Sequence, residues 1–377
     1  DLNYFRKLKK RFSNTTMYAI GDICLDKKYR SLMLKECDGL IYSPCEIDLN
    51  QMKDRVKDRK DKLLSGVITS ENQEIFTSKK QINLNKDNGT NIPRHEHFIK
   101  PGYRFPFARH IKFSTITATW GCPYSCSYCP DANIPPMVRT YDDILFELEY
   151  VSQLGIKELW FNDRSFGFPE NNIKNLLNGM IENFDFSWSC YFAPQTYNHQ
   201  LLELMSKAGC HTIVIGIESA DLSSLKKYKR IVKNDRMDKL LSHANHLKIN
   251  VCGDFIIGLE DENEDDIMRT IEYALNAQID YASFNIAAPY PGTDIRKKAA
   301  KDGVKFNEME GLDTLGRKGV LGNNKLDSDK IIELRSLAVR KFYFRPSYIY
   351  RRIKKTTSWE HFKIQFDEMK SLRIKML

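Results

Sequence analysis

The stretch Thr119–Pro130, TWGCPYSCSYCP, places three cysteines in one short loop. Cys122, Cys126 and Cys129 follow a C-x₃-C-x₂-C spacing. Three thiolates so close together can hold three irons of a cubane cluster and leave the fourth iron without a protein ligand. An iron with soft sulfur ligands and an open position can bind a substrate or a cofactor. We therefore ask which other residues serve such an iron.

Zinc is the main alternative for these cysteines. Structural zinc usually takes four ligands, often from two paired clusters. The chain has no second C-x₂-C pair, but His95 and His97 could supply a fourth ligand from upstream, so a zinc site stays open. Disulfides are disfavoured because the nine cysteines are an odd number, mostly scattered singly, with no secretory apolar segment. A reducing, cytoplasmic location is expected.

Length and charge limit the remaining possibilities. A chain of 377 residues can hold a main domain and a smaller one. Its 58 Lys and Arg against 49 Asp and Glu give a net charge of +9, spread along the sequence, which fits anionic partners without requiring nucleic acid. The longest apolar stretch, residues 251–259, is too short for a transmembrane segment. Because the first residue is Asp1, the chain is expected to be a fragment.

The chain divides into four parts. Residues 1–50 carry two strand-like segments around a helical one, and residues 51–110 are charged, broken and typical of a linker. From residue 111 to 298, six apolar strands alternate with helices, which predicts a parallel sheet covered on both faces. Residues 299–377 are expected to form a helical extension. The predicted fold class is α/β, a partial (β/α)₆ TIM-like barrel preceded by a truncated Rossmann-like segment.

Polar and glycine residues collect where the predicted strands end. Taken singly, each is more often a turn residue or a helix cap. The carboxyl ends of parallel strands meet at one rim, however, and the cysteine loop follows the first strand. These residues are Asn162, Asp163, Gly216, Glu218, Ser219, Gly258 and the turn Pro289–Thr293.

The sequence resembles the radical S-adenosylmethionine (SAM) superfamily. Tyr128 stands before the third cysteine, where that superfamily has an aromatic residue. The segments FNDRSFGFPE, AGCHTIVIGIES, GDFIIGLEDENEDD and APYPGTDI extend the resemblance to the class often paired with cobalamin-binding domains. It covers about residues 111–355. Two positions depart from the usual pattern, Ala220 in place of glycine and Glu260 in place of proline.

The resemblance implies a chemistry and a set of binding residues. The three cysteines would bind a [4Fe–4S] cluster, and SAM would chelate the open iron and yield a 5′-deoxyadenosyl radical on one-electron reduction. No catalytic residue beyond the cluster and SAM ligands is implied. Glu218 would contact SAM, with Gly216 and Ser219 beside it. The other implied contacts are Asn162 and Asp163 near the methionine end, Lys229 at the SAM carboxylate, and Gly258, Pro291, Gly292 and Tyr128 near the adenine.

The resemblance also bears on cobalamin and on the reaction. Residues 16–46 resemble the last part of a cobalamin-binding Rossmann-like domain, but the D-x-H-x-x-G signature for an axial histidine is absent. Cobalamin is therefore expected only with residues upstream of this chain. The expected reaction is methyl transfer to an unactivated carbon. The alternatives are a rearrangement or cyclisation without cobalamin, and a non-catalytic zinc-binding interaction protein.

Two kinds of partner are expected. One is a one-electron donor such as flavodoxin or ferredoxin, and the other is a small-molecule or lipid-like substrate. An RNA-modifying enzyme is a weaker reading of the basic charge, because no RNA-binding module signature supports it.

Overall fold

The computed structural model describes residues 2–20, 27–41, 67–70, 82–84, 92–99, 102–103, 105–230, 234–302, 322–356 and 358–374. Its centre is a parallel sheet of six strands, in which each strand lies beside its neighbour in the sequence. The predicted α/β fold with a partial barrel is therefore confirmed. The strands are β5 (Phe113–Ile116), β8 (Glu158–Phe161), β9 (Ser187–Tyr191), β10 (Cys210–Glu218), β11 (Asn250–Ile257) and β12 (Tyr281–Ile286).

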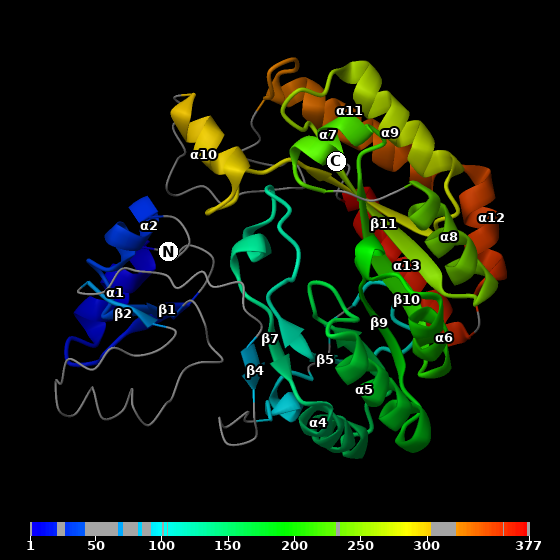
Figure 1. The fold of residues 1–377 in the computed structure, drawn as a ribbon, viewed down its shortest axis with the longest axis horizontal. Helices are drawn as coiled ribbons and strands as arrows, with labels where there is room; N and C mark the ends of the chain where they lie inside the picture. The colour runs from blue at the N-terminus through cyan, green and yellow to red at the C-terminus, as the bar shows by residue number, and fades with distance from the viewer. Residues whose placement is uncertain are drawn as a thin grey trace.

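The connecting helices lie along the outer side of this curved sheet (Figure 1). Side chains on alternate strand positions, such as Leu159, Ile213 and Phe255, pack against them in one fully buried core. The helices are α4 (Tyr141–Gln153), α5 (Glu170–Asn183), α6 (His199–Lys207), α7 (Leu222–Lys227), α8 (Asn234–His246) and α9 (Glu264–Asn276).

The start of α4 shows how the sequence sets a helix end. Thr140 accepts a hydrogen bond from the Asp143 backbone N–H, as an N-cap residue does. A full capping box would also return the Asp143 side chain to the Thr140 backbone. Instead, that carboxylate pairs with Arg139 Nε at 2.7 Å. The capping box is therefore half formed.

The amino-terminal ends of the six strands form the lower end of the barrel. There, aromatic side chains close the inner face of the sheet. Trp160 and Tyr281 point inward from β8 and β12, and Phe105 and Phe107 pack on them from the preceding segment. The ring centroids of Phe107 and Tyr281 lie 4.6 Å apart. We call these four residues the aromatic plug. The helices thus cover only the outer face, because the curved sheet fills its interior with its own side chains and this segment.

Parts of residues 51–110 are more than the predicted linker. β3 (Val67–Ile68) pairs with the N-terminal strands, and β4 (Ile82–Leu84) pairs with β7 (Met137–Arg139), which in turn pairs with β6 (Thr119–Trp120). A 3₁₀ turn, η4 (His95–His97), packs beside α4. These pairings join segments that are distant in the sequence, so no local sequence pattern predicts them.

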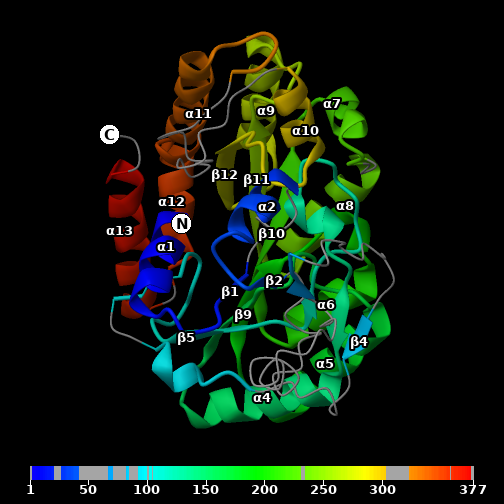
Figure 2. The same ribbon diagram turned by 90° about the vertical axis from the view of Figure 1, so that its left-hand side faces the viewer.

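The N-terminal unit combines α1 (Leu2–Arg11), β1 (Tyr18–Ile20), α2 (Lys27–Met33) and β2 (Gly39–Ile41). β1 and β2 are parallel, as in a Rossmann-like unit. The ends of both predicted strands, residues 21–23 and 42–44, lie outside the described residues. Figure 2 shows this unit in front of the open side of the barrel. One contact to it is the Arg296 guanidinium, 5.0 Å above the Tyr29 ring.

Within the described residues, the helices that follow the barrel are α10 (Asp294–Lys301), α11 (Ser328–Tyr343), α12 (Pro346–Lys354) and α13 (Trp359–Ile374). α11 packs against the outer face of β12, where Arg335 Nε donates to the Phe284 carbonyl at 3.1 Å. Among the helices in the described ranges, none has the length and apolar character needed to cross a bilayer.

Candidate functional site

The cysteine loop runs from β6 to η5 (Pro130–Asn133). It begins at Gly121, which has a φ of +73°. A Cβ at this position would lie 2.3 Å from the Pro135 carbonyl oxygen, so only glycine allows the chain to turn here. The next residue, Cys122, donates its N–H to the Ile134 carbonyl at 3.3 Å. The loop thus closes on its own far end.

Three other segments brace the loop. The Ser127 N–H donates to the Tyr228 carbonyl at 3.0 Å, and the Ser127 carbonyl accepts from the Asp294 N–H at 2.9 Å. The phenol of Tyr124 and the hydroxyl of Thr196 lie 2.7 Å apart. The loop is therefore fixed by the ends of β10–α7 and β12 and by the turn η6 (Pro194–Thr196) after β9.

The three cysteines are free thiols. Cys126 is buried and the other two are half-buried. Burial raises the pKa of Cys122 to about 11 and of Cys129 to about 12, so these two side chains are neutral thiols when no metal is bound. Reactive cysteines have lowered pKa values, whereas a coordinated metal deprotonates a thiol outright. These residues are therefore suited to ligating metal and unsuited to acting as free nucleophiles.

The spread of the sulfurs separates a cluster from zinc. Zn–S bonds of about 2.3 Å in a tetrahedron place sulfurs about 4 Å apart. Among the described residues, the three sulfurs do not form a group whose ligand atoms all lie within 4.8 Å of one another. His95 cannot complete a zinc site here, because Ser114 Oγ lies 2.6 Å from its Nδ1 and Glu147 Oε1 lies 2.9 Å from its Nε2. The arrangement fits a cluster of several metal atoms better than one ion.

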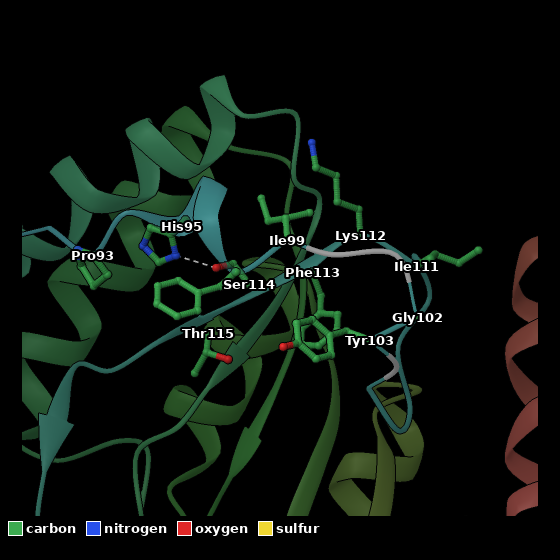
Figure 3. Close-up of a pocket in the computed structure, with 11 residues that line it drawn as sticks. Pro93, His95, Ile99, Gly102, Tyr103, Ile111, Lys112, Phe113, Ser114 and Thr115 are labelled. Atoms are coloured by element: carbon green, nitrogen blue, oxygen red, sulfur yellow. Dashed lines mark hydrogen bonds between the residues drawn. The ribbon is translucent and has the colours of Figure 1, made fainter. Parts of the chain in front are cut away.

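His95 belongs to a different feature, a pocket of about 570 Å³ beside the edge strand β5. Figure 3 shows His95 and Ser114 hydrogen-bonded at its wall. The lining is mostly apolar and includes Pro93, Tyr103 and Phe113, without any of the three cysteines. His97 is exposed on the same turn, with its Nε2 3.9 Å from Glu96.

Glu218 faces the cysteine loop from the end of β10. Tyr128 donates its phenol hydrogen to Glu218 Oε1 at 2.8 Å, and Arg230 Nε lies 3.9 Å from the same oxygen. Burial raises the pKa of Glu218, while Arg230 and Tyr128 act to lower it. Both contacts involve Oε1, so Oε2 has no hydrogen bond recorded within the described part of the chain.

The backbone at Glu218 is unusual. Its φ of +68° is left-handed, and the register between β10 and β11 shifts between Gly216 and Glu218. Such bulges and strained residues often aim a side chain at a functional site. At Gly216, an added Cβ would lie 2.2 Å from Glu218 Oε1, so glycine is needed for the carboxylate to fold back over the strand.

Arg230 is the residue that the sequence analysis missed. Its Nη2 donates to the Gly216 carbonyl at 2.8 Å and its Nη1 to Gln195 Oε1 at 2.9 Å, while its guanidinium also contacts Cys126. Its Nε is buried and has no hydrogen-bond partner among the residues that the structure describes. The neighbouring Lys229, which was assigned to the SAM carboxylate, is 65% exposed and lies 3.9 Å from Asp294. Its assigned role stays a prediction.

The two residues at the end of β8 separate in space. Asp163 is buried, and its carboxylate accepts the backbone N–H groups of Ala118 and Thr119 at 3.0 and 2.7 Å. Burial raises its pKa to about 7 even so. Asp163 therefore holds the strand that leads into the cysteine loop. Asn162 is exposed at the rim and accepts from Trp160 Nε1 at 3.3 Å.

The remaining rim residues form a second hydrogen-bonded group around Glu262. Ser219 donates to Glu262 Oε1 at 2.9 Å, and Glu262 Oε2 accepts the N–H groups of Gly258 and Leu259 at 3.0 Å each. Gly258 packs against Ile331 of α11. The predicted turn residues Pro291 and Gly292 are half-buried and lead directly into α10, whose first N–H, that of Asp294, bonds to the cysteine loop.

A carboxyl group inside the barrel was also missed. Asp254 lies on β11 in register with Gly216 on one side and Ser283 on the other. Ser283 hydrogen-bonds to it, and Asn285 donates to Ser283 Oγ at 3.0 Å. Burial, with Glu218 nearby, raises the pKa of Asp254 to about 7. The sequence marks it only as a single carboxylate in the apolar run INVCGDFIIGL, without showing what it faces.

Comparison with known proteins identifies the family of the central part of the chain. The sequence profile described as the Radical SAM superfamily matches residues 116–274, which contain the cysteine loop and β8 to β11. Residues 116–274 form a radical SAM domain. Domains of this superfamily use a [4Fe–4S] cluster and SAM, so the predicted superfamily, enzyme class and these two cofactors are confirmed. The superfamily also requires a reductant.

Relatives and a solved structure extend beyond this domain. An uncharacterized methyltransferase of Pyrococcus horikoshii is 26% identical over 85% of this chain, which spans 71% of that protein. The bacteriochlorophyllide d C-12(1)-methyltransferase of Chlorobaculum tepidum is 26% identical over 67% of this chain, which spans 57% of that protein.

The structure of the radical SAM methyltransferase TsrM from Kitasatospora setae, with cobalamin and a [4Fe–4S] cluster bound, has the same fold. The TM-score is 0.63 at 14% identity, over 86% of this chain and 67% of TsrM.

Proposed function

We propose that this chain is a radical SAM methyltransferase whose cluster is held by Cys122, Cys126 and Cys129. The hydrogen bond from Tyr128 to Glu218 supports this proposal most strongly. Tyr128 directly precedes Cys129, so one contact joins the cluster loop to the carboxylate across the mouth of the barrel. Loop and carboxylate then keep a fixed separation, which a cofactor bound to both requires.

A [4Fe–4S] cluster held by the three cysteines would supply the one-electron reduction that cleaves SAM. The chain's residues do the rest. The three thiols hold the metal, and the guanidinium of Arg230 beside Cys126 offsets the negative charge of the thiolates. Asp163 fixes the start of the loop through Ala118 and Thr119.

Glu218 and Arg230 are the proposed SAM contacts. Glu218 Oε2 would accept a hydrogen bond from the ribose hydroxyls or the amino group, and Arg230 Nε would donate to a ligand oxygen. A buried donor without a partner costs about 1–3 kcal/mol, so a ligand that satisfies it gains affinity. The other proposed contacts, with the roles assigned from the resemblance, are Tyr128, Asn162, Asp163, Gly216, Ser219, Lys229, Gly258, Pro291 and Gly292.

Methyl transfer is proposed from the names of the relatives, both methyltransferases. A histidine-ligated cobalamin does not fit the N-terminal unit, because residues 1–94 contain no histidine. No cobalamin-dependent step is therefore proposed. The proposed four-part division of the chain, with the β1–α2–β2 unit as a remnant of a cobalamin-binding-like domain, is compatible with this.

Two partners complete the proposal. The first is a one-electron donor such as flavodoxin or ferredoxin, which would deliver the electron at the exposed side of the cysteine loop. The second is a small-molecule or lipid-like substrate placed over the barrel mouth, near Asp254 and Tyr191. These two residues lie close together, since burial and the charge of Asp254 both raise the pKa of Tyr191. A cytoplasmic location is proposed because free thiols and a reduced cluster need reducing conditions.

Anaerobic reconstitution with iron and sulfide tests the proposal. The protein should take up about four irons per chain, as one cubane requires. With dithionite and methyl-labelled SAM it should form 5′-deoxyadenosine, and with a methyl acceptor S-adenosylhomocysteine as well. Formation of 5′-deoxyadenosine alone, with no methyl loss from SAM under any condition, would favour a rearrangement or cyclisation. One zinc per chain and no iron would support the non-catalytic alternative.

A further inference from the structure

Three metal-ligating side chains converge on the outer helices, outside the radical SAM site. They are His199 and Glu203 on α6 and His243 on α8. One ligand atom from each lies within 4.8 Å of the others. None of them has been given a part in binding the cluster or SAM.

The sequence brings the first two together. His199 and Glu203 are four residues apart on α6, which places them on the same face of the helix one turn apart. His199 Nδ1 lies 3.5 Å from Glu203 Oε1. His199 is 66% exposed and Glu203 42% exposed, so an ion from solvent can reach both.

His243 supplies the buried side of the group. It is 9% exposed, and its ring stacks on that of His199 with centroids 3.8 Å apart and an interplanar angle of 14°. Tyr197 Oη lies 3.3 Å from His243 Nδ1. When Nδ1 carries the proton it donates to that oxygen, and the lone pair of Nε2 is left for a ligand. Metal-binding histidines are typically oriented by such a second hydrogen bond.

We propose that His199, Glu203 and His243 bind one divalent transition metal ion, Zn²⁺ foremost, that joins α6 to α8. Two imidazoles and one carboxylate are a ligand set that zinc takes in proteins, with water in the fourth position. The two ring planes are nearly parallel in the stack, so the exposed His199 ring has to turn towards Glu203 before both imidazoles can direct a lone pair at one ion. The ion would bind the neutral form of both rings.

The position of the site gives the metal a structural consequence. Tyr197 directly follows the η6 turn, whose Thr196 contacts Tyr124 of the cysteine loop and whose Gln195 accepts from Arg230. Arg236 of α8 also donates to the Gln195 carbonyl at 2.7 Å. A metal that fixes α6 to α8 would therefore hold the turn that braces the cysteine loop.

The test uses full-length protein with its iron–sulfur cluster assembled under anaerobic conditions, so that the cysteines are already occupied. Zn²⁺ is titrated against a chromophoric chelator, and the bound zinc is examined by X-ray absorption. We expect one zinc per chain in addition to the cluster iron, with only nitrogen and oxygen neighbours. Saturating zinc should raise Tm by about 3 °C, because a ligand that binds only the folded state stabilises it.

Variants assign the ligands. His199→Ala and Glu203→Ala change exposed positions and should fold normally, yet each should weaken zinc binding by about 100-fold. Tyr197→Phe should weaken it by about 10-fold through loss of the orienting hydrogen bond. His97→Ala, a change at another exposed histidine, is the matched control and should have no effect. Sulfur in the zinc shell, no bound zinc, or unchanged affinity in both His199→Ala and Glu203→Ala would overturn the proposal.

Discussion

The amino-terminal and carboxyl-terminal ends of the six strands differ in how their buried polar groups are hydrogen-bonded. At the lower end, the aromatic plug fills the barrel, and Glu158 accepts the N–H groups of Arg109 and His110 at 2.8 and 3.1 Å. His211 Nε2 lies 2.8 Å from the other oxygen of Glu158. At the rim, Arg230 Nε is buried with no hydrogen-bond partner in the described part of the chain, and Glu218 has a left-handed backbone.

This difference separates stability from function. A buried polar group without a partner costs free energy, and a strained backbone costs more. The lower end shares the backbone cost, because Phe107 of the plug has a φ of +70°, but its buried carboxylate Glu158 is fully hydrogen-bonded. The rim combines a left-handed residue with a buried donor that is unpartnered among the described residues, within one contact of the cysteine loop. In partial barrels the chemistry is expected at the carboxyl ends of the strands, where this donor lies. Changes at the rim should therefore alter binding, and changes at the plug should alter folding.

The largest expected effect is at the cysteines. Cys126→Ala should abolish cluster retention and 5′-deoxyadenosine formation, because two thiolates do not hold a cubane. Iron content and visible absorbance after anaerobic reconstitution measure this. Cys190→Ala, at a buried cysteine on the outer face of β9, is the control and should keep about four irons per chain. A Cys126→Ala protein that retained its cluster would refute the ligand assignment.

The plug should show the reverse pattern. Phe107→Ala removes the ring that packs on Tyr281 and should lower the free energy of unfolding by about 3 kcal/mol. Denaturant unfolding measures the loss. Under native conditions, the SAM affinity of the folded, cluster-loaded fraction should stay within about twofold of wild type. A tenfold change in SAM affinity with no loss of stability would break the proposed division between the two ends.

Glu218 should affect binding without affecting the cluster. Glu218→Gln keeps the shape but removes the charge that accepts hydrogen bonds from SAM, which is worth about 2 kcal/mol or 30-fold in affinity. Equilibrium binding of SAM to cluster-loaded protein is the measurement. Glu260→Gln, a change at a nearby residue that pairs with Lys227 and Lys298, should leave SAM affinity unaltered. Equal affinities for wild type and Glu218→Gln would withdraw the assignment.

Asp254 gives the smallest effect and the one that depends on pH. Its pKa is raised from 3.8 to about 7, so between these values the folded state holds a proton that the unfolded state has lost. Its contribution to stability is therefore present at low pH and is lost as pH rises towards 7 and above. Asp254→Asn should be more stable than wild type by about 1–2 kcal/mol at pH 8 and by less at pH 5. A stability difference that does not change with pH would contradict the raised pKa.

The sequence predicted what depends on local pattern. The alternation of six strands with helices over residues 111–298 follows from the apolar spacing, and the cysteines could be placed at the rim because parallel strands end together. Asp254, Arg230 and His243 could not be assigned in this way. Asp254 and Arg230 reach the site because β10 and β11 lie side by side in the barrel. His243 reaches His199 because α6 and α8 pack against each other. Lys229 was assigned from the resemblance alone, and the sequence does not show which of two adjacent cations turns inward.

The central claim is that the cysteine loop and Glu218, together with the residues that contact Glu218, bind one cofactor between them. The most direct test is electron paramagnetic resonance of the dithionite-reduced cluster with and without SAM. We predict that SAM shifts the g values of the wild-type cluster, because SAM ligates the iron that the three cysteines leave open. Spectra that are identical with and without saturating SAM would contradict the account.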